Sequence, residues 1–355
     1  MPRITRHTTL QHQSFSIYDD IIDVRSSSEF AEDHIPGAIN LPVLSDEERA
    51  EVGTIYVQDS RFRARRRGAA LVSANISRHL QTFLVDKSAD YRPIIYCWRG
   101  GMRSAAMATV LSEVGWSVAV LDRGYKAWRR RAVSVLREDP APMKILLLDG
   151  QTGTAKTDIL RALAGGGCQT LDLEDCAKHR GSVFGQHGVH PQPTQKFFES
   201  LLLSALDQLD LQRHIVVEAE SNMIGKRLIP DRLANAMRSA PRIEIHADLQ
   251  TRARYLVQVY SEFKKDAERL EASINALQPF HSRGTIERWL KLATEMKGEQ
   301  LAAEIAEHHY DPLYSRQRHD QPVLKVCAPT LDSAGITSTA DKIAAFVAAL
   351  DNEIK

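Results

Sequence analysis

Residues 93–104 read PIIYCWRGGMRS and combine an apolar strand, a glycine-rich loop and the start of a helix. Residues 93–96 lack polar alternation, which is typical of a strand buried on both faces of a parallel sheet. The loop begins at Cys97, and a helix is expected over residues 104–114, with Gly115 as its left-handed C-terminal cap. The backbone N–H groups of such a loop, followed by a helix N-terminus, form a cradle for an anion.

Cys97 is the chemically reactive residue of this loop. The helix N-terminus carries about half a positive charge, and Arg99 and Arg103 add two full charges. The pKa of the thiol is therefore expected below its ordinary value of about 8.5. The alternative is an ordinary buried cysteine, but two glycines and two arginines follow at once. The predicted anion loop consists of Trp98, Arg99, Gly100, Gly101, Met102 and Arg103.

The C-x5-R spacing from Cys97 to Arg103 sets the size of the anion that the loop can hold. This spacing matches the loops of cysteine phosphatases and is one residue longer than the loop of simple sulfurtransferases. The extra residue leaves room for a tetrahedral phosphate group. However, a phosphatase also needs a general acid for its leaving oxygen. No residue identifies itself for this role, and Tyr96 stands where many cysteine phosphatases have histidine.

The chain around this loop resembles the rhodanese-like domains over about residues 15–136. The resemblance rests on three further segments, which are DVRS at 23–26, HIPGAINLP at 34–42 and LDRGY at 121–125. The resemblance implies a parallel sheet covered by helices. We expect Asp23 and His34 to hold this fold through an ion pair or a turn cap, rather than to take part directly in catalysis.

A second α/β rhythm follows the prolines at 140 and 142 and centres on LLLDGQTGTAKT at residues 146–157. We expect a strand over 143–148, a glycine-bearing turn and a helix that ends at Ala164. The turn fits the Walker A pattern G-x-x-x-x-G-K-[ST] except at Ala155, which replaces the second glycine and disfavours a positive φ. The predicted diphosphate-binding residues are Gly150, Gly153, Lys156 and Thr157.

Two carboxylates follow the strand expected over residues 214–217. Glu218 stands where a Walker B carboxylate would stand, and Glu220 lies on the same side of an extended segment. They would support metal-assisted phosphate chemistry, in which Thr157 would hold Mg²⁺. An ordinary pair of surface carboxylates is an equal alternative, and whether a metal is bound stays open.

Residues 61–67 read RFRARRR and contain five arginines. This local excess would suit contacts to nucleic-acid phosphates, with Phe62 stacking on a base. A solvated helix face is an equal alternative. Residues 129–131 are a weaker case of the same kind, and residues 179–182 read as a polar loop after a strand. The candidate nucleic-acid contacts are Arg61, Arg63, Arg65, Arg66, Arg67, His179 and Arg180.

The 355-residue chain is therefore expected to be an α/β protein with two domains. Residues 1–138 form a rhodanese-like parallel-sheet domain. Residues 139–355 form an α/β domain like the P-loop NTPases, with a helical section at about 250–307. A returning strand and a helix follow over 321–352, and the helix is expected to be capped by Ser338 or Thr339.

The net charge, the cysteine spacing and the apolar segments bear on which class of protein this is. A net charge of +1 does not by itself indicate a nucleic-acid-binding protein, and the four cysteines show neither a CxxC pair nor zinc spacing. No apolar signal-like segment begins the sequence, and the longest apolar stretch, residues 343–350, is too short to cross a membrane. We expect a cytoplasmic protein that does not associate with membranes.

Together these segments resemble the tRNA 2-selenouridine synthases over nearly the whole chain. Further matching segments include VGTIY at 52–56, HRGS at 179–182 and YDP at 310–312. The resemblance implies a transferase that replaces the sulfur of wobble 2-thiouridine in tRNA by selenium. It implies selenophosphate as the selenium donor and geranyl diphosphate as the source of an S-geranylated intermediate.

The residue patterns fit this chemistry. The Cys97 loop suits selenophosphate, the loop at 150–157 suits a diphosphate, and the arginine run suits tRNA. No tightly bound cofactor is expected, although Mg²⁺ is an open question. Ala155 and Ala219 depart from the pattern, so any altered function is expected in diphosphate or metal handling.

Two other functions stay open. One is a sulfurtransferase or cysteine phosphatase fused to a small-molecule kinase, which would hydrolyse or transfer nucleotide phosphate and would not bind tRNA. The other is a non-catalytic RNA-binding protein, in which Cys97→Ser would leave the cellular role intact. The substrate tRNAs, the preference for selenium or sulfur and the oligomeric state are not readable from the sequence.

Overall fold

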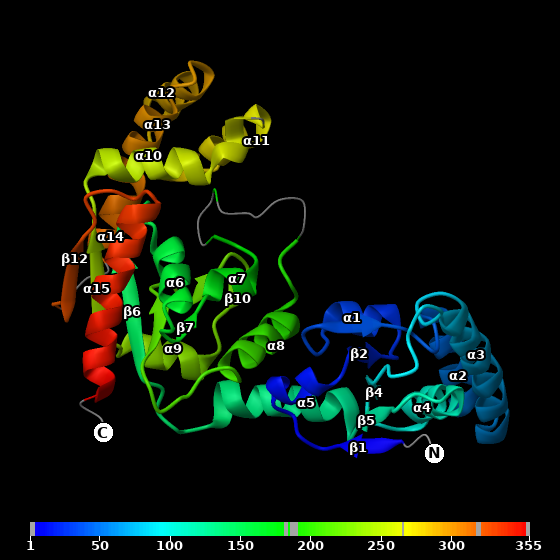
Figure 1. The fold of residues 1–355 in the computed structure, drawn as a ribbon. Helices are drawn as coiled ribbons and strands as arrows, with labels where there is room; N and C mark the ends of the chain where they lie inside the picture. Colours follow the sequence, from blue (N-terminus) through cyan, green and yellow to red (C-terminus); the bar gives the residue numbers. More distant parts are fainter. Residues whose placement is uncertain (1–3, 181–183, 185–190, 265, 317–320, 353–355) are drawn as a thin grey trace. The chain divides into compact units, whose positions relative to one another are not determined.

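The computed structural model describes residues 4–180, 184, 191–264, 266–316 and 321–352 (Figure 1). The chain forms two compact units, and each has its own five-stranded parallel sheet. The first unit contains Met1–Asp139 and Pro193–Gln208, and the second contains Pro140–Gln192 and Leu209–Lys355. Residues 139–355 were predicted to form one domain, whereas residues 193–208 group with the first unit.

The first unit has the strand order β1-β5-β4-β2-β3, with every pairing parallel. Its strands are β1 (Thr5–His7), β2 (Asp20–Asp23), β3 (Ala38–Asn40), β4 (Pro93–Tyr96) and β5 (Ala119–Leu121). Its α-helices are α1 (Ser27–Glu32), α2 (Asp46–Gln58), α3 (Arg61–Gln81), α4 (Met102–Val114), α5 (Gly124–Val133) and α8 (Gln195–Leu206). A 3₁₀ helix (His12–Ile17) and a π-helical turn (Ser134–Glu138) complete the unit.

The central strand β4 explains why this sheet is covered on both faces. Successive strand residues point to opposite faces. Ile95 accordingly packs into one apolar cluster with Met107 of α4, whereas Ile94 packs into another with Trp128 of α5. All four residues are fully buried. A strand apolar on both sides can fold only between two layers of helices, as the sequence predicted.

Helix α8 is fastened to the first unit by apolar and polar contacts. Leu203 joins the apolar cluster of Trp128, and the Trp128 indole donates to Ser200 Oγ at 3.0 Å. Glu199, which is 1% exposed, accepts hydrogen bonds from Arg129 and Arg137. The two arginines outweigh the effect of burial and lower the pKa of Glu199, so a buried carboxylate stays charged and paired.

The second unit has the strand order β12-β11-β6-β8-β7, again parallel throughout. Its strands are β6 (Ile145–Gly150), β7 (Thr170–Leu171), β8 (Ile215–Glu218), β11 (Arg242–His246) and β12 (Leu324–Cys327), with a hairpin of β9 (Met223–Ile224) and β10 (Arg227–Leu228). Its first helices are α6 (Lys156–Gly165), α7 (Leu173–Ala177), α9 (Asp231–Arg238) and α10 (Leu249–Val259). The remaining ones are α11 (Ala267–Asn275), α12 (Arg283–Thr294), α13 (Gly298–Ile305), α14 (Asp311–Arg316) and α15 (Ser333–Asn352), with short turns at Ser261–Lys264, Gln278–Phe280 and Ala306–Tyr310.

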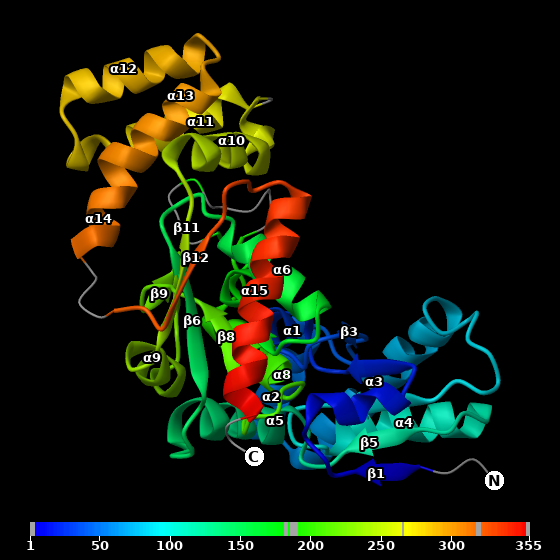
Figure 2. The same ribbon diagram turned by 60° about the vertical axis from the view of Figure 1, so that its left-hand side comes forward.

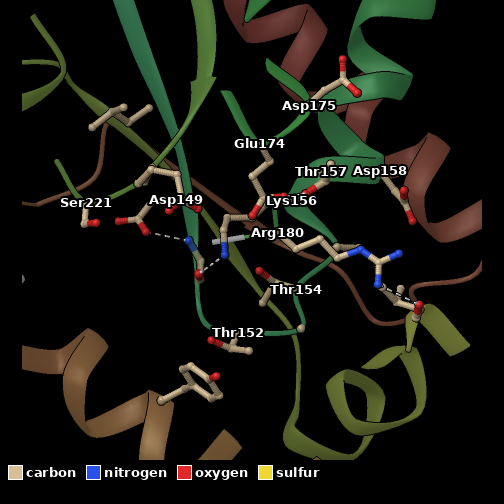
Figure 3. A pocket seen from close by; sticks show the side chains of 18 of the residues that line it. Asp149, Thr152, Thr154, Lys156, Thr157, Asp158, Glu174, Asp175, Arg180 and Ser221 are labelled. Atoms are coloured by element: carbon tan, nitrogen blue, oxygen red, sulfur yellow. Dashed lines mark hydrogen bonds between the residues drawn. The ribbon is translucent and has the colours of Figure 1, made fainter. Parts of the chain in front are cut away.

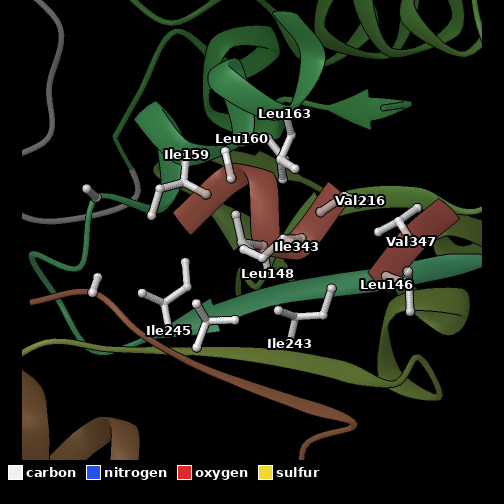
Figure 4. Close-up of a cluster of buried hydrophobic side chains, with 14 of the residues drawn as sticks. Leu146, Leu148, Ile159, Leu160, Leu163, Val216, Ile243, Ile245, Ile343 and Val347 are labelled. Atoms are coloured by element: carbon white, nitrogen blue, oxygen red, sulfur yellow. The ribbon is translucent and has the colours of Figure 1, made fainter. Parts of the chain in front are cut away.

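Helices α6 and α15 lie side by side on one face of this sheet (Figure 2). Ile159 of α6 and Ile343 of α15 meet Leu148, Val216 and Ile243 from three strands (Figure 4). Each of these side chains is fully buried, which contributes about 1.5–3 kcal/mol per residue. This core holds the end of β6 and the start of α6 in place, and the loop between them is the one predicted to bind phosphate.

The helical section predicted at about 250–307 is present as α10 to α13. The predicted cap of the last helix is wrong, because α15 begins at Ser333 and contains both Ser338 and Thr339. Strand β11 was not predicted, although it lies between β6 and β12. Within the described ranges, no helix combines the length and apolar character that a membrane span requires.

Candidate functional sites: a cysteine loop and a phosphate loop

Cys97 lies directly after β4, at the start of the loop that leads into α4. Its side chain is buried, with 3% of the residue exposed. The sulfur accepts a hydrogen bond from the backbone N–H of Gly101 at 3.3 Å and lies 3.2 Å from Ser104 Oγ. The loop therefore folds around the sulfur as an anion cradle folds around its ligand.

Hydrogen bonds lower the pKa of the Cys97 thiol. Burial is the largest single influence and raises the pKa, but the Ser104 hydroxyl and the backbone N–H groups of Ser104, Arg99 and Gly101 together outweigh it. The charges of Arg99 and Arg103 were expected to contribute to this lowering of the pKa. In the structure Arg103 instead forms an ion pair with Glu29 at 3.0 Å, and the Arg99 side chain is exposed.

Two glycines allow the cysteine loop to pack against the start of α5. Gly100 has a left-handed φ of +65°, and a Cβ there would meet Leu121 O at 2.9 Å. A Cβ on Gly124 would lie 2.2 Å from Cys97 O. The approach allows Tyr125 N–H to donate to Cys97 O at 2.9 Å. The LDRGY segment thus supports the Cys97 loop from outside, because only glycine fits there.

Trp98 and Met102 expose apolar surface beside the buried sulfur. Trp98 is 38% exposed and Met102 is 71% exposed. The Trp98 ring lies 5.2 Å from the Tyr125 ring, and the exposed Arg123 stands two residues before Tyr125. The loop predicted from the sequence therefore combines a buried nucleophile with an aromatic and basic rim.

Other residues of the rhodanese-like segments hold the fold. Asp23 is buried and forms an ion pair with Arg25 at 2.6 Å, and the Arg25 guanidinium lies 3.9 Å from the Tyr125 ring centre. His34 stacks between Phe30 and Phe197. The Tyr96 hydroxyl accepts from Ile35 N–H at 3.2 Å.

The phosphate loop connects β6 to α6 (Figure 3). Lys156 Nζ donates to Gly150 O at 2.8 Å, across the mouth of the loop. Thr157 Oγ1 donates to Glu174 Oε2 at 2.9 Å. Gly150 leaves no room for a Cβ, which would meet Ile245 O at 2.8 Å. The lysine and threonine predicted to contact phosphate thus lie at the first turn of α6, where the helix dipole favours anions.

Ala155 adopts the left-handed conformation that the glycine of the usual pattern would adopt. Its φ is 59° and its ψ is 30°. The strain is about 1–2 kcal/mol for a residue with a Cβ, while its methyl group is buried with Leu160 and Leu163. The departure at this position therefore leaves the backbone of the loop in the glycine-like conformation.

A cavity of about 590 Å³ opens over this loop. It has basic and acidic side chains in its wall. The basic residues are Lys156, Arg161, Arg180, Arg238 and Arg242, and the acidic ones are Asp149, Asp158, Glu174, Asp175 and Glu220. A cavity of this size and charge suits a small phosphorylated ligand.

The two predicted carboxylates have different surroundings. Glu218 is 1% exposed, accepts from Glu174 N–H at 2.8 Å, and its Oε2 has no partner among the described residues. Burial, followed by the charge of Asp172, raises its pKa. Glu220 instead lines the cavity, and burial followed by the charge of Glu174 raises its pKa to about 7. The alternative of an ordinary surface pair is therefore wrong for Glu218.

The candidate nucleic-acid contacts separate into two groups. Arg180 lines the phosphate-loop cavity and pairs with Glu262 at 3.0 Å, and His179 precedes it. The five arginines of residues 61–67 are exposed on α3, which begins at the Ser60 cap. Gly181 and Ser182 of the same predicted loop lie outside the described residues.

On α3, two of the five arginines form ion pairs, and Arg61 lies over the Tyr56 ring at 5.5 Å. Arg63 pairs with Asp59 at 3.1 Å and Arg67 with Glu51 at 2.7 Å. Arg65 and Arg66 have no ion pair within the part of the chain that the structure describes. The weaker basic run has a structural role, because Arg129 and Arg131 bind acidic residues of the α8 segment.

Several contacts that shape the phosphate loop were not predicted from the sequence. Glu174 accepts a hydrogen bond from Thr157, but Glu174 belongs to no recognised sequence motif. Arg252 of α10 donates to Thr152 O at 3.0 Å and pairs with Asp311 at 2.8 Å. Arg252 and Asp311 are 59 positions apart, so no local motif contains both of them. The YDP segment at 310–312 is the sequence feature that could have pointed to Asp311.

Comparisons with known proteins cover both units. The family model described as "tRNA 2-selenouridine synthase AAA domain" matches residues 143–294, and the model "Rhodanese-like domain" matches residues 8–131. The tRNA 2-selenouridine synthase of Shewanella denitrificans is 30% identical over 84% of this chain and 88% of its own length. That of Psychromonas ingrahamii is 34% identical, over 71% and 67%, and that of Nitrosomonas europaea is 36% identical, over 68% and 63%. With a rhodanese-like unit and a P-loop unit each carrying its anion loop, the chain belongs to the tRNA 2-selenouridine synthase family.

Proposed function

We propose that this protein is a tRNA-modifying transferase that replaces the sulfur of wobble 2-thiouridine by selenium. Selenophosphate supplies the selenium, and geranyl diphosphate supplies the geranyl group of an S-geranylated intermediate. The observation that carries the proposal is the presence of two anion loops in a chain of this family. One loop surrounds a thiol of lowered pKa and the other presents Lys156 at a helix N-terminus.

In the second unit, the thiocarbonyl sulfur of 2-thiouridine would attack the first carbon of the geranyl group. A carbon–sulfur bond forms, the carbon–oxygen bond breaks, and diphosphate leaves with the electron pair. The proton on N3 of the uracil ring is lost to solvent, so that the S-geranylated base is neutral. Lys156 and the N–H groups at the start of α6 are suited to stabilise the charge that develops on the diphosphate. Alkylation converts the sulfur into a better leaving group for the second step.

In the first unit, Cys97 would act on selenophosphate. Selenium in selenophosphate is already fully reduced, so transferring it to the sulfur as a perselenide would require an added oxidant. Attack of the thiolate on phosphorus balances without one, because a sulfur–phosphorus bond forms and selenide leaves. The selenium leaves as hydrogenselenide, which is a much weaker base than an alkoxide and therefore needs no general acid. Water then releases phosphate from the cysteine.

The selenide completes the exchange on the geranylated base. It attacks carbon 2 of the uracil ring, a carbon–selenium bond forms, and geranyl thiolate leaves and takes up a proton. The exposed Trp98, with the neighbouring Arg99 and Arg123, offers a stacking surface and positive charge for the nucleotide beside Cys97.

Mg²⁺ would suit the diphosphate loop in the way that it usually binds phosphates. Thr157 Oγ1 and Glu174 are oxygen ligands within 2.9 Å of each other. Among the described residues, no group of three or more histidine, cysteine, aspartate or glutamate residues is arranged to hold a metal. Mg²⁺ commonly takes one or two protein ligands and the oxygens of its phosphate ligand. When bound, it would neutralise charge on the leaving diphosphate.

The arginines of α3 offer a contact for the tRNA backbone. Five exposed arginines in seven residues supply charge, and Phe62 at 72% exposure supplies a ring next to it. Each arginine that neutralises a phosphate adds to the salt dependence of binding. tRNA affinity is therefore expected to fall steeply as the salt concentration rises. In the double variant Arg65→Ala/Arg66→Ala, the affinity should fall less steeply with salt.

The proposal is tested with purified protein and tRNA that contains 2-thiouridine. The tRNA is incubated with geranyl diphosphate, with and without selenophosphate, and its nucleosides are weighed by mass spectrometry. We expect a geranylated nucleoside without selenophosphate and a selenium-for-sulfur mass gain with it. Unchanged nucleosides from folded protein would instead favour a sulfurtransferase or phosphatase fused to a kinase, and nucleotide binding at the Lys156 loop would then be measured.

A further inference from the structure

A second, larger cavity lies in the helical section of the second unit. Its volume is about 970 Å³, and its wall comes from α10, α11, α12, α13 and the turns next to them. Most of the lining side chains are apolar, and they include Leu256, Phe263, Leu270, Ala293, Leu301 and Ala302. The charged lining residues Glu271, Lys297 and Glu299 are exposed, so the charge lies at the rim.

This apolar cavity adjoins the phosphate-loop cavity. Thr152, Leu256, Tyr260 and Tyr310 line both of them. The phosphate loop also touches α10 directly, because a Cβ on Gly153 would lie 2.9 Å from Leu256 Cγ. Figure 3 shows Thr152 at the turn of the loop, below Lys156. A ligand whose phosphate groups contact Lys156 can therefore continue past Thr152 into apolar surroundings.

We propose that this apolar cavity receives the hydrocarbon chain of the prenyl diphosphate held by the loop at 150–157, and that Ala293 and Ala302 limit the length of that chain. The inference rests on the proposed function for the identity of the ligand. Its own basis is the continuity of a charged cavity with an apolar one.

The size and the apolar wall of the cavity suit a hydrocarbon chain. Sites of about 300–1,000 Å³ hold small molecules, and apolar walls bind carbon chains. Each methylene buried in such a cavity tightens binding about fourfold. A nucleotide would place its polar base and ribose against Phe263, Leu270 and Leu301, where polar atoms would lose their hydrogen bonds with water. A branched hydrocarbon has no such cost.

The walls contain two small residues at which a larger side chain would fill the cavity. Ala293 lies on α12 and Ala302 on α13, and both are partly exposed. Phenylalanine at either position would occupy space that the chain needs, and neither residue lines the phosphate-loop cavity. Glu287 of α12 is exposed and does not line the cavity, so Glu287→Phe is a matched control.

The test measures binding of three probes by calorimetry: inorganic pyrophosphate, dimethylallyl diphosphate and geranyl diphosphate. For the full-length protein we expect geranyl diphosphate to bind at least about 100-fold more tightly than pyrophosphate. Ala302→Phe is expected to weaken geranyl diphosphate at least about tenfold, to weaken the five-carbon ligand less, and to leave pyrophosphate unchanged. Ala293→Phe should behave alike, and Glu287→Phe should match the unaltered protein.

Several results would overturn the inference. One is equal affinity of the unaltered protein for geranyl diphosphate and pyrophosphate. Another is that Ala293→Phe and Ala302→Phe bind geranyl diphosphate as tightly as Glu287→Phe does. Unchanged pyrophosphate binding would show that both variants are folded. Failure of the proposed function gives a different pattern, because chain-dependent binding would persist while mass spectrometry finds no geranylated tRNA.

Discussion

The cysteine loop and the phosphate loop are built alike but present their anion sites differently. Each follows a buried parallel strand and ends at a helix N-terminus. In the cysteine loop, the protein's own sulfur already occupies the cradle, where it accepts from Gly101 N–H and lies beside Ser104. In the phosphate loop, Lys156 is bonded to Gly150 O, and the wall contains several carboxylates.

The difference separates a loop that activates its own nucleophile from one that must admit an external anion. The first needs N–H groups aimed at a fixed sulfur, and these outweigh burial to lower its pKa. The second needs a cavity, a lysine that can contact the ligand and surrounding charge that the ligand can balance. The same strand–loop–helix geometry thus serves two chemistries because a cysteine starts one loop and a lysine ends the other.

The largest expected effect comes from removing the defining residue of each loop. Cys97→Ser should lower the selenium step at least about a thousandfold, because the thiolate is lost, and should leave geranylation and tRNA binding unchanged. Lys156→Ala should weaken diphosphate binding about 10–100-fold and reduce geranylation, because a charge-assisted contact is lost. Mass spectrometry of tRNA nucleosides measures both steps. Equal loss of both steps in each folded variant would contradict this division of labour.

A second prediction concerns the support behind the cysteine loop. Gly124→Ala should lower the free energy of unfolding by about 3 kcal/mol or more, because its Cβ would lie 2.2 Å from Cys97 O. Urea unfolding measures this change. Gly37→Ala is the matched control, since Gly37 has a φ of +82° but no atom within 4 Å of the added Cβ.

The control isolates the close approach from the backbone strain. Gly37→Ala should lose only about 1–2 kcal/mol, which is the cost of a left-handed alanine. If Gly124→Ala and Gly37→Ala lost similar free energies of unfolding, the close contact between α5 and the cysteine loop would not contribute to stability.

A third prediction uses the pKa of about 7 at Glu220. Burial and the charge of Glu174 raise this pKa, so Glu220 gains its negative charge as the pH rises through neutrality. Without divalent cations, pyrophosphate affinity should therefore fall more between pH 6 and 8 in the unaltered protein than in Glu220→Gln, by about tenfold. Calorimetry at each pH measures the difference, and the ionisation of pyrophosphate itself is common to both proteins. Parallel pH profiles would exclude Glu220 from the anion site.

The smallest effect is expected at Ala155. Ala155→Gly relieves the left-handed strain of about 1–2 kcal/mol but loses a buried methyl group worth about 0.8 kcal/mol, so the free energy of unfolding should change by less than about 1 kcal/mol. Ala162→Gly, in the interior of α6, is the comparison and should lose about 1 kcal/mol. Urea unfolding distinguishes them. Equal destabilisation of the two variants would show that Ala155 is not strained.

The chemistry of both loops could be predicted from sequence because each is contiguous. Cys97 and Gly101, or Lys156 and Thr157, are only a few residues apart, and the order of strand, loop and helix fixes their directions. The source of the Cys97 pKa shift could not be predicted in the same way, because Arg103 is taken up by Glu29, which is 74 positions away.

Contacts between residues far apart in the sequence determined the features that were not predicted. Residues 193–208 read as part of the second domain, yet Trp128 and Arg129 bind them to the first unit. Strand β11 was missed because its alternating polar residues resemble a surface segment, although it lies inside a sheet. The basic run at 129–131 resembled a nucleic-acid contact until its partners on the α8 segment were placed beside it.

The sequence by itself determined the two anion loops, the parallel strands that precede them and the helical section, because periodicity and motif spacing are local properties. The tertiary structure alone decided that a carboxylate from α7 meets Thr157, that α8 completes the first unit, and that an apolar cavity shares lining residues with the phosphate-loop cavity. These features depend on side chains that are distant in the chain, and only packing brings them together.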